Sequence, residues 1–132
     1  SRGLGDVYKR QIIMPHIPDK IYAFAVAKTY YNELLDAGVK IYEYEPGFVH
    51  AKVFVSDDTK AVVGTINLDY RSLFHHFECG ALLYENSQIA AVEEDFRNTL
   101  KKCIKIKAGD YQKQKLYMRV IGKVLRMFAP LM

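Results

Sequence analysis

The sequence lacks the features that mark several large classes of protein. Its 132 residues include only 8 glycines and 4 prolines, too few for a collagen or a low-complexity disordered chain. The 2 cysteines, Cys79 and Cys103, are too few for a disulfide scaffold and lack the clustering of a zinc site. We therefore expect two free thiols in a reducing compartment.

Long apolar runs are also missing. The best run, Ile21 to Ala27, ends at Lys28 and falls well short of the roughly 20 apolar residues that a membrane-spanning helix needs. The charged N-terminal residues are not followed by the long apolar stretch of a secretory signal. We expect that the chain as given neither crosses a bilayer nor begins with a signal peptide.

The composition that remains is that of an ordinary folded domain. Hydrophobic residues make up 50% of the chain and charged residues 26%, which supplies both a core and a solvated surface. The formal net charge of +4 suits an anionic partner such as nucleic acid, acidic lipid headgroups or a phosphorylated small molecule. Charge alone does not choose among these partners, and plain solubility explains it equally well.

The first eleven residues, SRGLGDVYKRQ, differ from the rest of the chain. They show little hydrophobic pattern and end abruptly at Ile12. The segment resembles the translation of a sequencing adapter, so we expect it to be foreign to the protein and loosely held. In that case the natural N-terminus is missing, and residues 12–132 are a fragment of a longer protein.

The hydrophobic period alternates between that of strands and that of helices, which predicts an α/β domain with a layered sheet flanked by helices. Gly38 is expected to end the first helix in a left-handed conformation. Strands are predicted at residues 12–17, 39–45, 48–56, 61–66 and 74–84. Helices are predicted at residues 20–37, from Ser87 to about residue 103, and at residues 110–128.

A group of polar residues follows a fixed spacing around two of these strands. His50 and Lys52 are two residues apart in the strand 48–56, so their side chains are expected to share one face. Asp57 follows at the strand end, and Thr65 and Asn67 share a face of the next strand. The spacing His-x-Lys-x4-Asp-x6-Gly-Thr-x-Asn arises by chance in on the order of one chain in 10⁴ to 10⁵.

This pattern resembles the HKD motif of the phospholipase D superfamily, with Thr65 where many members have serine. The motif region spans residues 44–71. Within and beside it, residues 34–52 and 64–72 are similar to the C-terminal half of bacterial cardiolipin synthases. The short segments 18–20 and 77–78 are similar as well. The resemblance covers residues 12–132. It implies a phospholipase D-like fold, as one half of the usual two-motif pseudo-dimer. His76 departs from the asparagine that is common at its position.

The resemblance implies a phosphatidyltransferase that makes cardiolipin and glycerol from two phosphatidylglycerol molecules, without a metal or another cofactor. A neutral nitrogen of His50 would attack phosphorus and form a phosphohistidine. Lys52 would stabilise the negative charge on the phosphoryl oxygens, to which Thr65 and Asn67 would donate hydrogen bonds.

A carboxylate would hold the other ring nitrogen of His50 and fix its tautomer. Asp57 and Glu78 are both candidates, and the spacing does not decide between them.

The second motif that the family uses to protonate the leaving group is missing from this sequence. The other histidines, His16, His75 and His76, lack a lysine two residues later. Adjacent residues of a strand face opposite sides, so the pair at 75–76 is not expected to share a metal ion. The partner half is either the upstream part of a longer enzyme, favoured by the adapter-like start, or a second copy about a two-fold axis. Alone, the chain is expected to be inactive.

The expected partners are phosphatidylglycerol, cardiolipin and an anionic membrane surface at the cytoplasmic face of the cell membrane, with no nucleic acid. Five basic residues interleave with apolar ones between Tyr111 and Met132. Such a helix either lies on anionic lipid or packs its apolar side on the domain. Two other hypotheses remain open. One is a homodimeric phosphodiesterase or nuclease with one HKD motif per chain, and the other is a domain that only binds anionic membranes.

Overall fold

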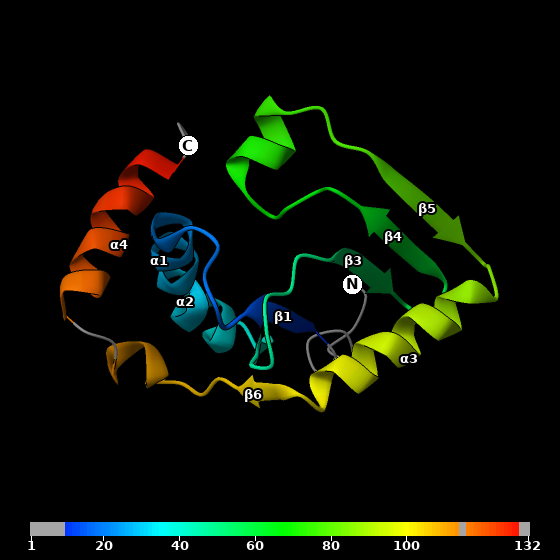
Figure 1. Cartoon of the computed structure of the whole chain (residues 1–132), viewed down its shortest axis with the longest axis horizontal. Coiled ribbons are helices and arrows are strands. Elements are labelled where there is room, and N and C mark those ends of the chain that lie inside the picture. The colour runs from blue at the N-terminus through cyan, green and yellow to red at the C-terminus, as the bar shows by residue number, and fades with distance from the viewer. Residues whose placement is uncertain (1–9, 114–115, 130–132) are drawn as a thin grey trace. The chain divides into compact units, whose positions relative to one another are not determined.

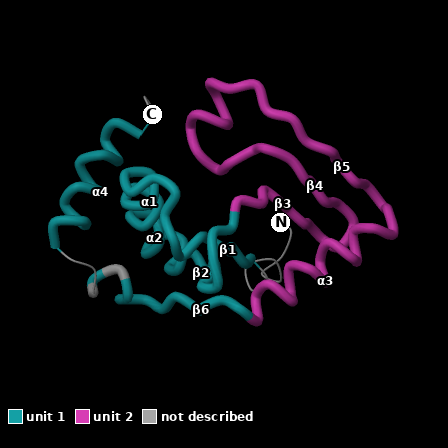
Figure 2. Tube along the Cα trace, viewed as in Figure 1, with its two compact units in different colours: residues 1–49, 102–129 teal, residues 50–101, 130–132 magenta. Residues whose placement is uncertain are grey.

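The computed structural model describes residues 10–113 and 116–129 (Figure 1). The chain divides into two compact units, which are coloured in Figure 2. Unit 1 comprises residues 1–49 and 102–129, and unit 2 comprises residues 50–101 and 130–132. In the part of the chain that is described, every helix is too short or too polar to span a bilayer.

Unit 1 is built on a three-stranded sheet in the order β1-β2-β6. Strand β1 (Gln11–Pro15) pairs in parallel with β2 (Lys40–Tyr44), and β6 (Cys103–Lys105) pairs with β2 in the antiparallel sense. Two helices, α1 (Ile21–Thr29) and α2 (Tyr31–Asp36), form the crossover that a parallel pair of strands requires. The sequence analysis missed β6, which has only three residues.

The start of β1 lies within the segment that the sequence analysis predicted to be foreign. Residues 1–9 of that segment lie outside the described residues. Gln11 pairs with Lys40, and the backbone N–H of Lys40 donates to the carbonyl of Arg10 at 2.9 Å. Residues 10 and 11 are therefore held in the sheet, unlike the loose attachment that we expected.

The predicted helix 20–37 is divided at Tyr30. The hydroxyl of Thr29 donates to the carbonyl of Val26 at 2.6 Å, a side-chain bond that competes with the helix ladder and bends helices. The end of α2 confirms the predicted glycine terminator, because Gly38 has a φ of 82°. The N–H groups of residues 38 and 39 donate to the carbonyls of residues 35 and 34, which is the Schellman pattern.

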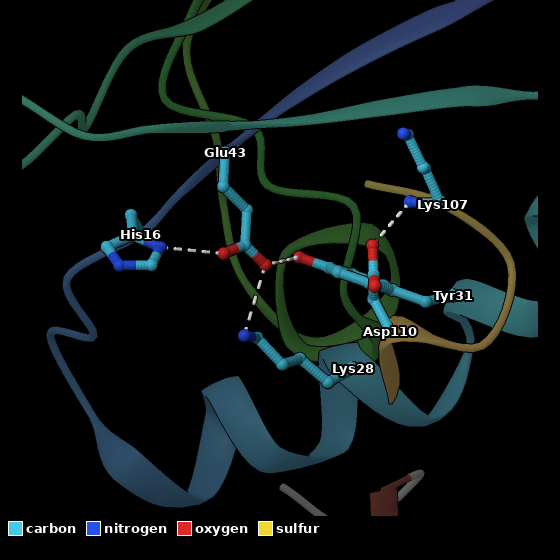
Figure 3. Close-up of polar contacts among 6 residues, drawn as sticks. All are labelled: His16, Lys28, Tyr31, Glu43, Lys107 and Asp110. Carbon is cyan, nitrogen blue, oxygen red and sulfur yellow. Dashed lines mark hydrogen bonds and ion pairs between the residues drawn. The ribbon is translucent and has the colours of Figure 1, made fainter. Parts of the chain in front are cut away.

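Unit 1 contains a buried charged residue, Glu43, whose carboxylate lies next to Tyr31 (Figure 3). The ammonium of Lys28 lies 3.1 Å from Oε1 of Glu43, and the hydroxyl of Tyr31 donates to the same oxygen at 3.1 Å. Nδ1 of His16 lies 2.8 Å from Oε2. Burial, and then the neighbouring negative charge, raise the pKa of Tyr31 above that of a free phenol. These partners satisfy the carboxylate where water is excluded.

The C-terminal segment of unit 1 contains a 3₁₀ turn (Asp110–Lys113) and helix α4 (Leu116–Phe128), where the sequence predicted one helix over residues 110–128. Helix α4 packs on α1 at Gly122, where an added Cβ would lie 2.7 Å from the carbonyl oxygen of Ala25. Near its end, Arg126 pairs with both carboxylate oxygens of Glu33, at 2.7 and 2.9 Å.

The described part of unit 2 contains a three-stranded antiparallel sheet, one α-helix and a short π-helix. Strands β3 (Lys52–Ser56), β4 (Lys60–Gly64) and β5 (Gly80–Tyr84) pair in that order. Helix α3 (Gln88–Leu100) contacts β3 and β4, and it buries Ile89, while Ala61 is buried on β4. With unit 1, this confirms the predicted α/β class.

A π-helix at Arg71–His75 replaces the first part of the strand predicted at residues 74–84. The N–H of His76 donates to the carbonyl of Arg71 at 2.9 Å, the i to i+5 bond of a π-helix. Asp69 starts the turn, since its side chain accepts from the N–H of Ser72 at 2.7 Å and its carbonyl from that of Leu73 at 3.0 Å. This capping contact competes successfully with the apolar alternation that suggested a strand.

Candidate functional site

Strand register brings the separated parts of the polar motif to one end of the unit 2 sheet. Lys52 pairs with Gly64, and Gly64 pairs with Gly80. Strand β3 therefore begins, β4 ends and β5 begins at this same end. Just outside the strands at this end, which we call the site end, lie His50, Thr65, Asn67 and Glu78.

Gly64 allows the two chains to approach closely at the site end. A Cβ at this position would lie 2.3 Å from the carbonyl oxygen of Cys79 and 2.6 Å from the Cα of Gly80. At Gly80, by contrast, the nearest atom to an added Cβ is a side-chain methyl at 3.5 Å. The glycine of the sequence motif is thus a steric requirement of this crossing.

Thr65 ties the end of β4 to the segment that enters β5. Its backbone N–H donates to the carbonyl of Cys79 at 2.9 Å, and the N–H of Cys79 donates to the Thr65 hydroxyl oxygen at 3.1 Å. The same hydroxyl donates to Oε2 of Glu78. The threonine is therefore fixed by three contacts across the strand ends.

Ser72 completes a hydrogen-bonded chain through the site end. Its buried side-chain oxygen accepts from Nδ2 of Asn67 at 3.2 Å, and it also hydrogen-bonds Glu78. The bonds from Thr65 and then Ser72, followed by the electrostatic effects of His76 and Lys52, lower the pKa of Glu78 below its ordinary value of 4.5. The sequence analysis did not single out Ser72, because no spacing rule marks it.

The two residues that open the motif differ from the prediction in their backbone. His50 lies in an irregular segment just before β3, so the shared strand face predicted for His50 and Lys52 is not formed. Instead, the ammonium of Lys52 donates to the backbone carbonyl of His50 at 2.7 Å. His50 is exposed.

Asp57 lies at the opposite end of β3 from Lys52. Five residues at about 3.3 Å each separate the two along the strand, roughly 17 Å. Asp57 and Asp58 have φ values of 53° and 55°, and the N–H of Thr59 donates to the carbonyl of Ser56 at 3.2 Å. This is the pattern of a type I′ hairpin turn. Of the two carboxylates that the spacing left open, Glu78 lies at the site end and Asp57 does not.

The loop between Asn67 and Glu78 contains large apolar side chains. Four of them are more than half exposed, although an apolar group in water is unfavourable. They are Leu68, Leu73, Phe74 and Phe77. Tyr70 stacks on Phe74 with ring centroids 5.9 Å apart. The polar groups of the site end thus lie beside an apolar loop.

Within residues 10–113 and 116–129, no three histidine, cysteine or acidic side chains are placed to hold one ion. His76 instead accepts a hydrogen bond from Nε of Arg71.

Comparison with known proteins identifies relatives over most of the chain. The family model described as "Cardiolipin synthase, PLD-like domain" matches residues 8–100. An uncharacterized protein of Streptococcus mutans is 56% identical over 92% of the chain and 26% of its own length. Cardiolipin synthase 2 of Bacillus cereus is 39% identical over 92% of the chain and 24% of its length, and a Clostridium perfringens cardiolipin synthase is 38% identical over 92% and 26%. The chain spans about a quarter of the length of these relatives. No solved structure matches it.

Proposed function

The chain belongs to the family of cardiolipin synthases with a phospholipase D-like domain, and we propose that it supplies one half of the active site of a phosphatidyltransferase. The reaction converts two phosphatidylglycerol molecules into cardiolipin and glycerol. One observation carries the proposal. Strand register and the hydrogen bonds through Ser72 gather Thr65, Asn67 and Glu78 at the end of the sheet where Lys52 begins β3.

His50 is the proposed nucleophile or general acid of this half. As nucleophile, its ring nitrogen donates a lone pair to phosphorus, and the bond from phosphorus to the glycerol oxygen breaks. The histidine of the other half supplies the proton that the departing oxygen takes. A hydroxyl of the second phosphatidylglycerol then passes its proton back to the histidine of the other half, and its oxygen attacks phosphorus as the bond from phosphorus to His50 breaks. One diester replaces another, so the exchange requires no energy source.

The phosphoryl oxygens gain negative charge as each bond forms. Lys52 provides a positive charge held at the start of β3, and Thr65 and Asn67 provide hydroxyl and amide donors. These donors already have partners in Glu78 and Ser72, and they exchange those bonds for the phosphate. The two polar contacts keep the donors in place before substrate arrives.

Glu78 is the carboxylate that we assign to the orientation of His50. It lies at the site end, and its lowered pKa keeps it ionised at neutral pH. A carboxylate next to imidazole fixes the tautomer and stabilises the charged ring. Asp57 is a positioning residue in this account, because it shapes the turn that joins β3 to β4.

The other half of the site comes from the rest of a longer protein or from a second copy of this chain. The relatives named cardiolipin synthase are about four times as long as the matched region, which favours the first source. We place the whole protein at the cytoplasmic face of the cell membrane, where its phosphatidylglycerol substrate and cardiolipin product lie. The exposed apolar loop beside Asn67 favours a lipid over the nucleic acid of the alternative, a homodimeric phosphodiesterase.

Cleavage assays on the purified chain distinguish the two functions. The chain is incubated with phosphatidylglycerol and, separately, with DNA over a range of protein concentrations, and gel filtration reports its oligomeric state. The proposal predicts a chain that turns over neither substrate by itself. DNA cleavage that grows with dimer formation and is lost in His50→Asn would establish the nuclease instead.

A further inference from the structure

The outward face of α4 is apolar along its whole length. Seven side chains on it are exposed by 46% or more, although all are large and apolar. They are Leu116, Tyr117, Val120, Ile121, Val124, Met127 and Phe128. Their spacing of three and four residues places them on one arc of the helix, since each residue turns by about 100°. We call this arc the outer face of α4.

The opposite side of α4 accounts for its packing on unit 1. Gly122 brings the helix against the backbone of Ala25, and Ala129 is buried at the end. Arg126 holds Glu33 and lies 3.9 Å from the centroid of the Tyr30 ring. A surface helix normally turns its large apolar residues inward. Here small residues and an ion pair make the contact with α1, and the large apolar residues of the outer face remain in solvent.

Charge indicates what covers the outer face. Helix α4 contains no acidic residue, and of its three basic residues Arg126 is paired with Glu33 and Arg119 has a buried Nε, which leaves Lys123 as the cation beside the outer face. Lys123 is exposed at the edge of the arc, three residues from Val120 and four from Met127. A long cationic side chain in this position keeps its stem on apolar surface while its ammonium reaches phosphate headgroups. Pairing of two copies through this face would instead bring like charges together.

We propose that the outer face of α4 docks unit 1 on an anionic phospholipid surface, with its apolar residues between the headgroups. The nature of the lipid rests on the proposed function, whose substrate is an anionic phospholipid. An amphipathic helix binds such a surface through buried apolar area together with attraction of its basic residues to the headgroups. Docking would hold unit 1 at the surface that contains the substrate.

Vesicle sedimentation tests the proposal with the whole 132-residue chain. Vesicles of phosphatidylglycerol and phosphatidylcholine are compared with vesicles of phosphatidylcholine alone. We expect at least ten-fold tighter binding to the anionic vesicles, weakened by salt. Val124→Asp should reduce this binding at least ten-fold. Leu82→Asp, a matched change at an exposed leucine of unit 2, should leave it within two-fold.

Charge reversal gives a second, independent variant. Lys123→Glu should weaken binding to the anionic vesicles several-fold, whereas Lys101→Glu, at an exposed position after α3, should have a smaller effect. Far-UV circular dichroism and thermal unfolding confirm that each variant remains folded, and Val124→Gln replaces Val124→Asp if the charged variant unfolds.

Three results would overturn the docking proposal. In the first, Val124→Asp and Leu82→Asp lose vesicle binding equally. In the second, the chain shows no preference for anionic vesicles. In the third, the chain self-associates in sedimentation velocity and Val124→Asp abolishes this association. The last result would assign the outer face to a second copy. Binding is measured without turnover, so an inactive catalytic site does not affect the result. Failure of docking likewise leaves the role of His50 to its own tests.

Discussion

The substitution Gly64→Ala tests whether the close crossing of β4 and the segment before β5 builds the site. The new Cβ would lie 2.3 Å from the carbonyl oxygen of Cys79, about 1 Å short of ordinary contact, which begins near 3.4 Å. Both neighbours are backbone, so a side-chain rotation cannot relieve the clash. The strand ends must separate. The backbone bond from the Thr65 N–H to the Cys79 carbonyl, and the bond from the Cys79 N–H to the Thr65 hydroxyl oxygen, must then lengthen or break.

The expected cost follows from these contacts. Overpacking costs about 1–3 kcal/mol, and each lost hydrogen bond adds roughly 0.5–1.5 kcal/mol. With both hydrogen bonds lost, we expect the free energy of unfolding of unit 2 to fall by about 2–6 kcal/mol in Gly64→Ala. Urea unfolding followed by far-UV circular dichroism measures this change. Amide hydrogen exchange at Thr65 and Cys79 locates it, because those two N–H groups should lose protection first.

Gly80→Ala is the matched control, since the two glycines are paired in the sheet. Its added Cβ would meet side-chain methyl groups at 3.5 and 3.6 Å, which is ordinary van der Waals contact. We expect a change in unfolding free energy below about 1 kcal/mol. Equal costs for the two substitutions, or unchanged protection of the Thr65 amide in Gly64→Ala, would refute the steric argument.

Three further predictions concern buried and titrating groups. Glu43→Gln should destabilise unit 1 by about 2–4 kcal/mol in urea unfolding, because it leaves the largely buried ammonium of Lys28 without its counter-ion. Glu45→Gln, at an exposed site, should cost less than about 0.5 kcal/mol, and equal costs would contradict the role of Glu43. The lowered pKa of Glu78 means that this carboxylate stabilises the folded state above pH 4.5 and loses that effect as the pH falls through its folded pKa. The wild-type chain should therefore lose more stability on acidification than Glu78→Gln, and parallel pH profiles would contradict this. Iodoacetamide should modify the exposed Cys79 faster than Cys103, because burial raises the pKa of the Cys103 thiol. Peptide mass spectrometry measures the two rates, and equal rates would contradict the burial of Cys103.

Local chemistry made much of the fold predictable from sequence. Gly38 ends α2 as expected, because a left-handed residue follows the last helical turn. The strand predicted at residues 39–45 is observed as β2. The resemblance of the motif and its flanking residues to cardiolipin synthases is confirmed by the family model. The spacing of hydrophobic residues and the residue types at turns act over only a few neighbouring positions, so they can be read from one sequence.

The remaining features depend on contacts between distant or weakly marked residues. Strand β6 has three residues, too few for a period to show. The π-helix at Arg71–His75 depends on Asp69 acting as a cap. The separation of Asp57 from the site end depends on where β3 begins, which pairing with β4 determines. The role of Ser72 likewise depends on its hydrogen bonds to Asn67 and Glu78, which only the folded structure shows.

The most direct test of the central claim, that His50 belongs to one half of a shared transferase site, is cardiolipin formation by a graft. The chain replaces the matching region of Bacillus cereus cardiolipin synthase 2, and cardiolipin made from labelled phosphatidylglycerol is quantified for the graft, for its His50→Asn variant and for the chain alone. The account predicts product from the graft and at least a thousand-fold less from the variant and from the isolated chain. Three results would contradict it. The His50→Asn variant makes cardiolipin at the rate of the graft, the isolated chain makes cardiolipin, or the graft folds but makes none.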